Sequence, residues 1–439
     1  MNLLFTNRFY YALGGIASLF VFSWLLGFNI QIPVILLTCF SILVLADAAA
    51  LFLNKRNIKS ERAAPDRFSN GDKNLIRLQL TSFYSFRIHL LIIEELPEQY
   101  QARDNVFETT LLPYASSQFS YLLRPLERGE YHFGYTHLLA ASPLQLIRRK
   151  IKGSAPATIA VYPSFVQMRK YELQARQAQQ AEAGSKRLRK IGHSMEFEQI
   201  KEYVSGDDIR SLNWKATARK GGLMVNHFAD ERSQQVYCLI DKGRLMKMPF
   251  EGLSLLDYAI NTSLVLCNVS LHRQDKFGLI SFSHKAGSVL LADRRPIQLD
   301  NVLQALYRLD TEFLESDFEK LYLQVRTYVR NRSLLVLFTN FESLSGMRRQ
   351  LPYLRQMAKH HLLLVVFFEN SELKHMTEQE VHDLESVYTK TIASKFVLEK
   401  RMIVKELQQN GILSILTTPQ QLTINAVNKY LELKSRQAI

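Results

Sequence analysis

The 439-residue sequence contains only three cysteines and none of the short motifs that commonly carry catalysis. Three cysteines cannot build a disulfide framework, and Cys39 lies inside an apolar run, which favours a reducing compartment. A GxxxxGK phosphate loop, an HExxH zinc motif and a GxSxG nucleophile elbow are all missing. His360 and His361 are adjacent, so their side chains point apart and make a poor metal pair. We therefore expect no enzymatic activity and no cofactor.

Two long apolar runs lie near the N-terminus. They extend from Phe9 to Phe28 and from Val34 to Leu53, and each has about the twenty residues that a membrane-spanning helix needs. Lys and Arg flank the outer ends of the pair but are absent from the loop between the runs. The positive-inside rule therefore predicts that both ends, and everything after the second run, lie in the cytoplasm. We expect residues 1–56 to form a two-helix transmembrane hairpin rather than a cleaved signal peptide.

The chain has a formal net charge of +14, and its basic residues gather where it would lie beside a membrane. Basic clusters follow the second apolar run and recur at residues 148–152 and 186–190, which suits an anionic leaflet. They lack interleaved aromatic side chains and any duplex-reading motif, so we expect no nucleic-acid binding. Asp47, inside the second run, is either a proton-handling or helix-contact group or a carboxylate that reaches the interface or its partner helix.

The rest of the chain divides by its hydrophobic period. Short alternating runs separated by turn residues predict a small β-sandwich over residues 57–163. Residues 164–200 are rich in Gln, Ala, Arg and Lys, which predicts a charged helical arm or linker. Over residues 233–439, fully apolar runs alternate with helical stretches. This alternation predicts an α/β domain with a mostly parallel sheet that is covered on both faces.

Asp241 and Asn340 follow two of the predicted parallel strands, where sheets of this kind bind ligands. An Asp after the first strand is where a von Willebrand factor A domain carries its Asp-x-Ser-x-Ser motif, whose carboxylate and hydroxyls hold a divalent cation. Here Gly243 and Leu245 stand in place of the two serines. We therefore expect no metal, and Asp241 would cap nearby backbone N–H groups. The alternative is a divalent-metal-dependent binding module or hydrolase that uses the Asp241 loop.

A charge-dense segment, residues 201–232, predicts a helix followed by a strand. Asp207 or Asp208 can cap a helix that runs to about Arg219, and a glycine pair follows it. Apolar side chains fall on two sides of this helix, with Trp214 on one of them. We predict that the helix is wedged as a joint between two bodies, and a joint that also forms a docking surface is the open alternative. The signature residues are Tyr203, Gly206, Asp207, Asp208, Arg210, Asn213, Trp214, Ala218 and Arg219.

The segment EFEQIKEYVSGDDIRSLNWKATARKGGLMVNHF at residues 196–228, followed by LID, closely resembles the signature of the bacterial family called domain of unknown function fifty-eight. RGEYHFG at 128–134 and SPLQLIRR at 142–149 extend the resemblance. It implies a von Willebrand factor A-like, Rossmann-like fold for residues 233–439. It also implies a non-enzymatic adaptor in the inner membrane that works with a MoxR-type AAA+ ATPase in a chaperone-like or envelope-related assembly. We accordingly expect a protein partner and no small-molecule ligand.

Overall fold

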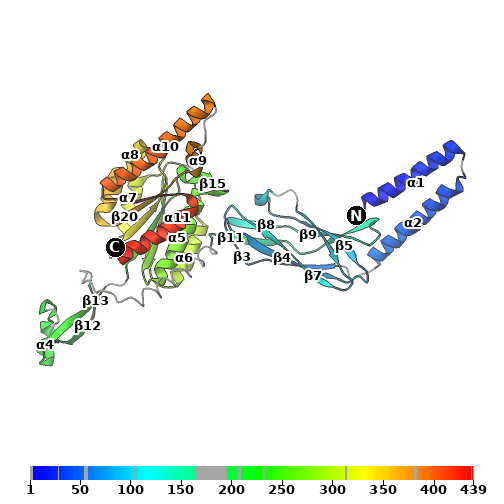
Figure 1. The fold of residues 1–439 in the computed structure, drawn as a ribbon. Coiled ribbons are helices and arrows are strands. Elements are labelled where there is room, and N and C mark those ends of the chain that lie inside the picture. Colours follow the sequence, from blue (N-terminus) through cyan, green and yellow to red (C-terminus); the bar gives the residue numbers. More distant parts are fainter. Residues whose placement is uncertain are drawn as a thin grey trace. The chain divides into compact units, whose positions relative to one another are not determined.

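The structure, a computed structural model, describes most of the chain. The described residues are 3–27, 29–53, 58–101, 105–164, 195–204, 209–230, 233–311, 314–378, 383–436 and 438. The chain divides into two units, Met1–Tyr162 and Pro163–Ile439, whose elements Figure 1 labels. The first unit has its own hydrophobic core cluster, and the α/β part of the second has core clusters on both faces of its sheet.

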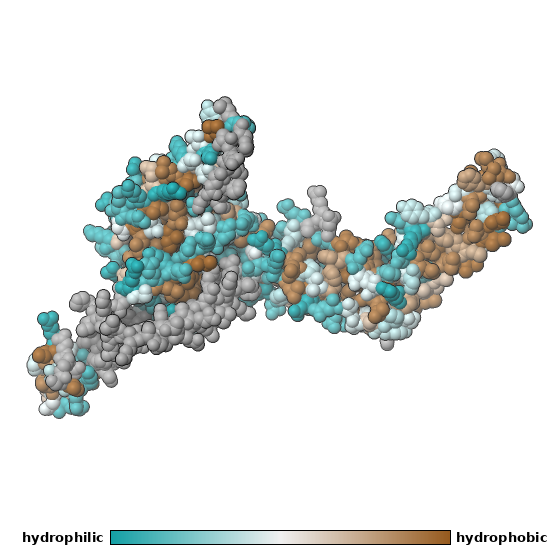
Figure 2. All heavy atoms as spheres, viewed as in Figure 1, coloured by the Kyte–Doolittle hydropathy of each residue, from teal (hydrophilic) through white to brown (hydrophobic). Residues whose placement is uncertain are grey.

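Two apolar helices belong to the first unit. Helix α1 spans Asn7–Leu26 and helix α2 spans Gln31–Phe52, and both are long and apolar enough to cross a membrane. Most of their side chains are exposed, and Figure 2 shows the apolar surface that this pair presents. The prediction of two long apolar helices is confirmed.

The remainder of the first unit is β-rich, as predicted. Its sheets have the strand orders β1-β10-β9-β5-β6, β3-β11-β8 and β2-β4-β7. Alternate residues of each core-facing strand are buried, and all three sheets contribute side chains to one core cluster. The elements are β1 Leu3–Phe5, β2 Ile58–Ala63, β3 Arg67–Ser69, β4 Asn74–Ser82, β5 Ile88–Glu94, η1 Glu98–Tyr100, β6 Val106–Leu111, β7 Ser116–Leu123, β8 Gly129–Phe133, β9 Thr136–Ala141, β10 Ile147–Lys152 and β11 Ala157–Tyr162.

The end of helix α2 packs into this β-rich region. Asp47 is 2% exposed, and its Oδ2 accepts hydrogen bonds from the backbone N–H groups of Leu146 (3.2 Å) and Ile147 (3.1 Å). Leu51 is fully buried, and its carbonyl accepts a hydrogen bond from the Tyr84 hydroxyl at 3.0 Å. Asp47 thus reaches the backbone at the start of β10 rather than the partner helix. Strand β1, which the sequence does not predict, pairs antiparallel with β10 just before α1 begins.

The α/β part of the second unit contains a mixed, mostly parallel sheet, as predicted. Its order is β18-β17-β14-β19-β20-β21, and only the edge pair β17–β18 is antiparallel. Helices α5, α6 and α11 cover one face, and α7, α8 and α10 cover the other. The main elements are β14 Gln235–Asp241, η3 Arg244–Lys247, β15 Pro249–Phe250, β16 Leu253–Ser254, α5 Leu255–His272, β17 Lys276–Phe282, β18 Ala286–Asp293, α6 Ile297–Tyr307, α7 Phe318–Tyr328, β19 Leu334–Phe338, α8 Leu344–His360, β20 Leu362–Phe368, α9 Ser371–Glu378, α10 Leu384–Gln409, β21 Leu413–Thr417, η4 Pro419–Gln421 and α11 Leu422–Ser435.

The signature segment forms a separate two-stranded sheet. Strand β12, Met195–Glu202, pairs antiparallel with β13, Met224–Asp230, and between them lie η2, Ile209–Ser211, and α4, Trp214–Lys220. Strand β12 starts inside the range predicted as a helical arm, because its sequence alternates apolar and charged residues and β13 supplies backbone partners. Residues 165–194 of the predicted arm lie outside the described residues.

Candidate functional site

Asp241 lies where the strand order reverses. It ends β14, which lies between β17 and β19, and ligands of open α/β sheets bind at such a switch point. The residue is 3% exposed. Its Oδ2 accepts a hydrogen bond from the Thr339 hydroxyl at 2.6 Å, and its Oδ1 accepts from the Gly243 N–H at 2.8 Å and from the Ser316 hydroxyl. Burial raises the pKa of Asp241 above its usual range, and these hydrogen bonds oppose that rise.

The glycine at position 243 is part of this arrangement. A Cβ at Gly243 would collide with the Ser316 hydroxyl that donates to Asp241. Ser316, from the segment before α7, therefore occupies the space that a side chain on the loop would need. Leu245 lies in η3 and is half-buried. The carboxylate is thus engaged by the hydroxyls and backbone of the protein itself.

Asn340 follows β19, and its side-chain oxygen contacts the ammonium of Lys400. It is 7% exposed, and its Oδ1 accepts a hydrogen bond from the Lys400 Nζ at 2.6 Å. Within the described ranges, no group of three or more His, Cys, Asp or Glu side chains is placed to hold a metal ion. An ammonium on the Asn340 oxygen repels a divalent cation, so the geometry disfavours metal binding between Asp241 and Asn340.

Lys400 lines a pocket of about 360 Å³ at the carboxyl ends of β19, β20 and β21. The pocket is bounded by the loop after β19, strand β15, the start of α5, α9, α10 and η4. Most of the lining is apolar, and Asn340, Glu342, Glu369, Asn370 and Lys400 are its polar groups. The larger apolar side chains around it are Met248, Phe250, Leu255, Phe368, Leu373 and Phe396. Mostly apolar walls with a few polar groups are typical of a binding site.

Lys400 is an amine in a poorly solvated position. It projects from α10, is half-buried, and its Nζ lies 5.8 Å from the centre of the Phe367 ring. Burial lowers the pKa of Lys400 to about 8, and attraction to Glu342 partly opposes this shift. An ammonium has three donors, and one of them is used on neutral Asn340. The group is therefore suited to hold an acceptor that enters the pocket.

Helix α10 leads an apolar strip into this pocket. Tyr388, Ile392 and Phe396 are 65%, 55% and 43% exposed, and each is four residues from the next, so they lie on one side of the helix. Lys400 continues the same spacing. Figure 1 shows the amino-terminal part of α10 projecting beyond the sheet of this unit. The strip and the pocket together form one surface, which we call the α10 surface.

The predicted helix of the signature segment is shorter than expected. Helix α4 begins at Trp214, because the Asn213 side chain accepts a hydrogen bond from the Ala216 N–H at 3.0 Å and so caps the helix. Ile209–Ser211 forms a separate 3₁₀ turn. The helix ends at Gly221, whose φ of 72° is the left-handed C-cap that the sequence indicates. Gly206 and the predicted caps, Asp207 and Asp208, lie outside the described residues.

The other signature residues spread over this small sheet. The Tyr203 N–H donates to the Leu223 carbonyl at 2.9 Å, Arg210 lies in η2, and Ala218 and Arg219 lie exposed on α4. The Trp214 ring is 69% exposed in the described part of the chain. Its role as an anchor between two bodies therefore stays a prediction.

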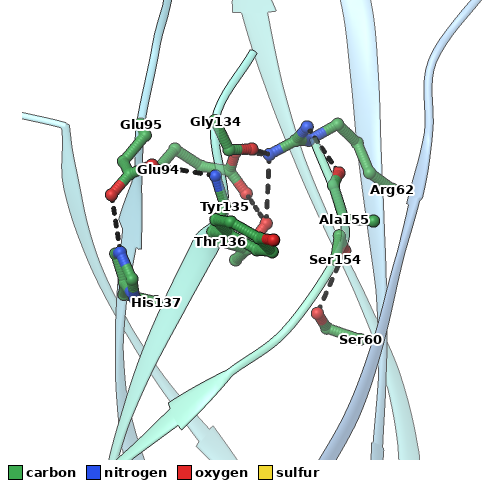
Figure 3. Close-up of polar contacts among 10 residues, drawn as sticks. All are labelled: Ser60, Arg62, Glu94, Glu95, Gly134, Tyr135, Thr136, His137, Ser154 and Ala155. Atoms are coloured by element: carbon green, nitrogen blue, oxygen red, sulfur yellow. Dashed lines mark hydrogen bonds and ion pairs between the residues drawn. The ribbon is translucent and has the colours of Figure 1, made fainter. Parts of the chain in front are cut away.

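A buried ion pair in the β-rich unit escapes the sequence analysis. The Arg62 Nη2 lies 2.7 Å from the Glu94 Oε2, and their side chains are 3% and 0% exposed. The Thr136 hydroxyl donates to the other Glu94 oxygen at 2.7 Å, and Arg62 also donates to the Gly134 carbonyl at 3.0 Å (Figure 3). The cluster joins β2 of one sheet to β5 and β9, which are neighbours in another sheet. The sequence does contain a signal for this pair. Every second residue of β5 from Ile88 onward is buried, and Glu94 falls in that series.

A second pair beside this cluster is more open to solvent. The Glu95 Oε1 lies 2.6 Å from the His137 Nε2, and the Tyr135 N–H donates to the other Glu95 oxygen at 2.9 Å (Figure 3). The hydrogen bond with His137 is the main cause that lowers the pKa of Glu95. With the Glu95 side chain 49% exposed, this pair has the character of a surface contact.

Comparison with known proteins finds a described sequence family whose model matches part of the second unit. Residues 199–407 match the family described as Protein of unknown function DUF58, a range that contains Asp241, Asn340 and Lys400. The chain is 27% identical over 250 residues to the uncharacterized protein YeaD of Bacillus subtilis (strain 168). That match covers 55% of this chain and 59% of YeaD, so the chain spans about three fifths of the length of this relative.

Two solved structures can be compared with about a quarter of the chain. The CARDB domain of the PF1109 protein from Pyrococcus furiosus is 9% identical, with a TM-score of 0.17, and covers 24% of this chain and 92% of that domain. A PapD-like domain of human CEP192 is 14% identical, with a TM-score of 0.16, and covers 22% of this chain and 84% of that domain. Scores of this size do not establish a shared fold.

Proposed function

We propose that this chain is a non-enzymatic, membrane-anchored interaction protein whose α/β domain docks a protein partner on the α10 surface. The carrying observation is the continuity between the exposed strip Tyr388–Ile392–Phe396 and the pocket that ends at Lys400. Aromatic and aliphatic side chains around a desolvated pocket are the usual centre of a protein–protein interface. A partner segment that lies along the strip would insert an apolar side chain into the pocket and offer an acceptor to Lys400.

The resemblance of the signature segment supports the identity of the partner. It implies a MoxR-type AAA+ ATPase, in a chaperone-like or envelope-related assembly. The strand order 3-2-1-4-5-6 in chain order, with one antiparallel edge strand, supports a von Willebrand factor A-like domain. The engaged state of Asp241 supports docking through side chains rather than through a bound cation.

The anchor is the pair of helices α1 and α2. Their apolar exposed surfaces support two spans of the inner membrane, and the distribution of Lys and Arg in the sequence supports a cytoplasmic position for everything after them. Between anchor and α/β domain, three sheets that share one core support a β-sandwich.

Crosslinking and affinity purification from membranes, with and without ATP and magnesium, test this function. Wild-type chain should recover one reproducible ATPase partner, and Ile392→Ser should lose it, because the variant places a hydroxyl in the middle of the strip. Leu398→Ser is the matched control: Leu398 is 58% exposed on the same helix but lies off the strip. Equal recovery with Ile392→Ser, or no reproducible partner in any condition, would contradict the proposal.

A further inference from the structure

Both apolar helices are attached to the same end of the β-rich region. Thr6, at the start of α1, donates its hydroxyl to the Leu146 carbonyl, and Asp47 of α2 accepts from the N–H groups of Leu146 and Ile147. The inference that follows rests on the membrane anchoring proposed above, which puts this end of the β-rich region at the bilayer surface.

Aromatic side chains mark the level of that surface. Phe5 of β1 stacks on Phe9 of α1 with ring centres 4.3 Å apart, and Phe9 lies 5.5 Å from Phe40 of α2. Tyr10 and Tyr11 in the first turn of α1 are 58% and 78% exposed. Tyrosine is enriched where a membrane meets water, so the headgroup layer lies at the first turn of α1.

Two loops at this end present apolar side chains to the same layer. The loop after β6 carries Leu112 and Tyr114, which are 62% and 70% exposed, and the loop after β9 carries Leu144, which is 49% exposed. Tyr114 has a left-handed φ of 51°, and its N–H donates to the Tyr84 carbonyl at 3.1 Å. The backbone thus holds an exposed ring at the tip of this loop, in a conformation that non-glycine residues rarely adopt.

A polar pocket of about 230 Å³ lies between the strands that lead to these two loops. Strand register puts Arg148, His89 and Thr110 in one row across the outer face of the sheet, beside the loops. The next row, two residues farther from the loops, contains Glu108 and Leu91. All five residues line the pocket. Lys150 of β10 also lies in this farther row but does not line the pocket. Among the lining side chains, the row nearer the bilayer therefore carries a guanidinium and an imidazole, and the farther row carries the carboxylate.

This order of charges matches a phospholipid headgroup. The phosphate of a phospholipid lies next to the acyl chains, and an ethanolamine ammonium lies farther out. Glu108 lies one strand across and two residues along from His89, which puts their Cα atoms about 8 Å apart, so their side chains can reach the two ends of one headgroup. We propose that this pocket binds the headgroup of an amine-bearing phospholipid. Arg148 and His89 hold the phosphate, Glu108 holds the ammonium, and Leu144 and Leu112 contact the start of the acyl chains.

Depth measurements on the full chain in phosphatidylcholine vesicles separate this inference from the anchoring on which it rests. In a Cys39→Ser background, a fluorophore should attach only at an introduced cysteine, because Cys238 and Cys267 are buried. A fluorophore on Leu144→Cys or Tyr114→Cys should be quenched by spin-labelled lipid. Leu122→Cys, 57% exposed near the other end of β7, should not be quenched. Val21→Cys on α1 reports the anchor. Quenching at Val21 without quenching at Leu144 overturns the inference and leaves the anchor standing, whereas no quenching at Val21 overturns both.

Lipid retention tests the headgroup. Detergent-solubilised full chain, incubated with equal amounts of phosphatidylethanolamine and phosphatidylcholine, should retain phosphatidylethanolamine preferentially. Arg148→Gln should reduce retention of phospholipid about tenfold, the equivalent of one charged hydrogen bond. Glu108→Gln should remove the preference for the ethanolamine lipid. Lys150→Gln is the matched control, since Lys150 is half-buried on the same strand but does not line the pocket. Wild-type retention of phospholipid in Arg148→Gln, or a wild-type preference for phosphatidylethanolamine in Glu108→Gln, would overturn the proposal.

Discussion

The β-rich unit and the edge of the α/β sheet treat buried charge in different ways. In the β-rich unit, Arg62 meets Glu94, and a hydroxyl and a backbone carbonyl complete the cluster. At the sheet edge, the hydrogen bond of Lys400 goes to neutral Asn340, beside an apolar pocket. Attraction to Glu342 offsets only part of the cost of burying this ammonium, and a fold often retains such a poorly solvated charge where a ligand can use it. The first pair therefore holds two sheets together, whereas the surroundings of Lys400 fit the binding role proposed for the α10 surface.

Removing one partner of the first pair should have the largest effect. Arg62→Met leaves the Glu94 carboxylate buried without a cation, which should cost about 3–5 kcal/mol of unfolding free energy. Urea denaturation of the full chain in detergent, followed by circular dichroism, measures it. Lys59→Met on the same strand is the control, because Lys59 pairs with Glu61 in solvent, and it should change stability little. The double variant Arg62→Met/Glu94→Leu should regain part of the loss. If Arg62→Met alone were as stable as the wild type, the Arg62–Glu94 pair would not differ from Lys400 in its contribution to stability.

Substitution of Asp241 tests whether the carboxyl ends of the parallel strands also contain a charge with a purely structural role. Asp241→Ala strands the hydroxyls of Ser316 and Thr339 and the N–H of Gly243, and should cost about 2–3 kcal/mol by the same denaturation measurement. Calorimetric titration of the wild type with magnesium and manganese provides the second readout. A stoichiometric cation site that Asp241→Ala abolishes would favour the metal-dependent alternative and reverse our interpretation of this loop.

Lys400→Met should behave in the opposite way to Arg62→Met. The folded state binds the Lys400 proton less tightly than the unfolded chain does, because burial lowers the pKa from 10.5 to about 8. The cost of this lysine is therefore fully present below pH 8, and it disappears as the pH rises to 10.5. The variant should be more stable than the wild type by about 1 kcal/mol at pH 7, after allowance for solvent screening, while partner binding is lost. Lys395→Met, exposed on the same helix, is the control. Parallel stability profiles from pH 7 to 10.5 would contradict this interpretation.

Trp214→Ala should have the smallest effect on the free energy of unfolding, because the ring is 69% exposed. The joint interpretation predicts a different readout. Loss of the ring should loosen the connection and speed proteolysis between residues 161 and 236, as measured by limited digestion and mass spectrometry. An unchanged cleavage pattern would contradict the joint, with or without a docking surface.

The sequence predicts the main elements of the α/β unit because buried parallel strands are continuous apolar runs. It does not predict β18, whose half-exposed residues lack such a run, or β1, whose three residues are too few to show a strand pattern. In the signature segment, Asp207, Asp208 and Asn213 are all residue types that cap helices, and local pattern does not rank them. The structure selects Asn213, whose amide also donates to Asn226 of β13.

At the sites, strand ends indicate Asp241 and Asn340, but their partners come from distant segments. Lys400 is 60 residues from Asn340 and lies on a helix rich in charge, so it reads as an ordinary surface lysine. Ser316 is 75 residues from Asp241. Contacts of this kind depend on tertiary packing, so neither the hydrophobic period of a segment nor a short sequence motif predicts them.

The attachment of strand β10 has a mechanical consequence. A hairpin joined to the β-rich region by chain alone would let that region swivel freely above the bilayer. Here, β1 pairs with β10 along its length, and Asp47 holds the first residues of the same strand. Both helices of the hairpin are thus attached at the same strand, one through the preceding strand β1 and the other through Asp47. With the membrane anchoring proposed above, a tilt or rotation of the hairpin would tilt or rotate the β-rich region by the same angle.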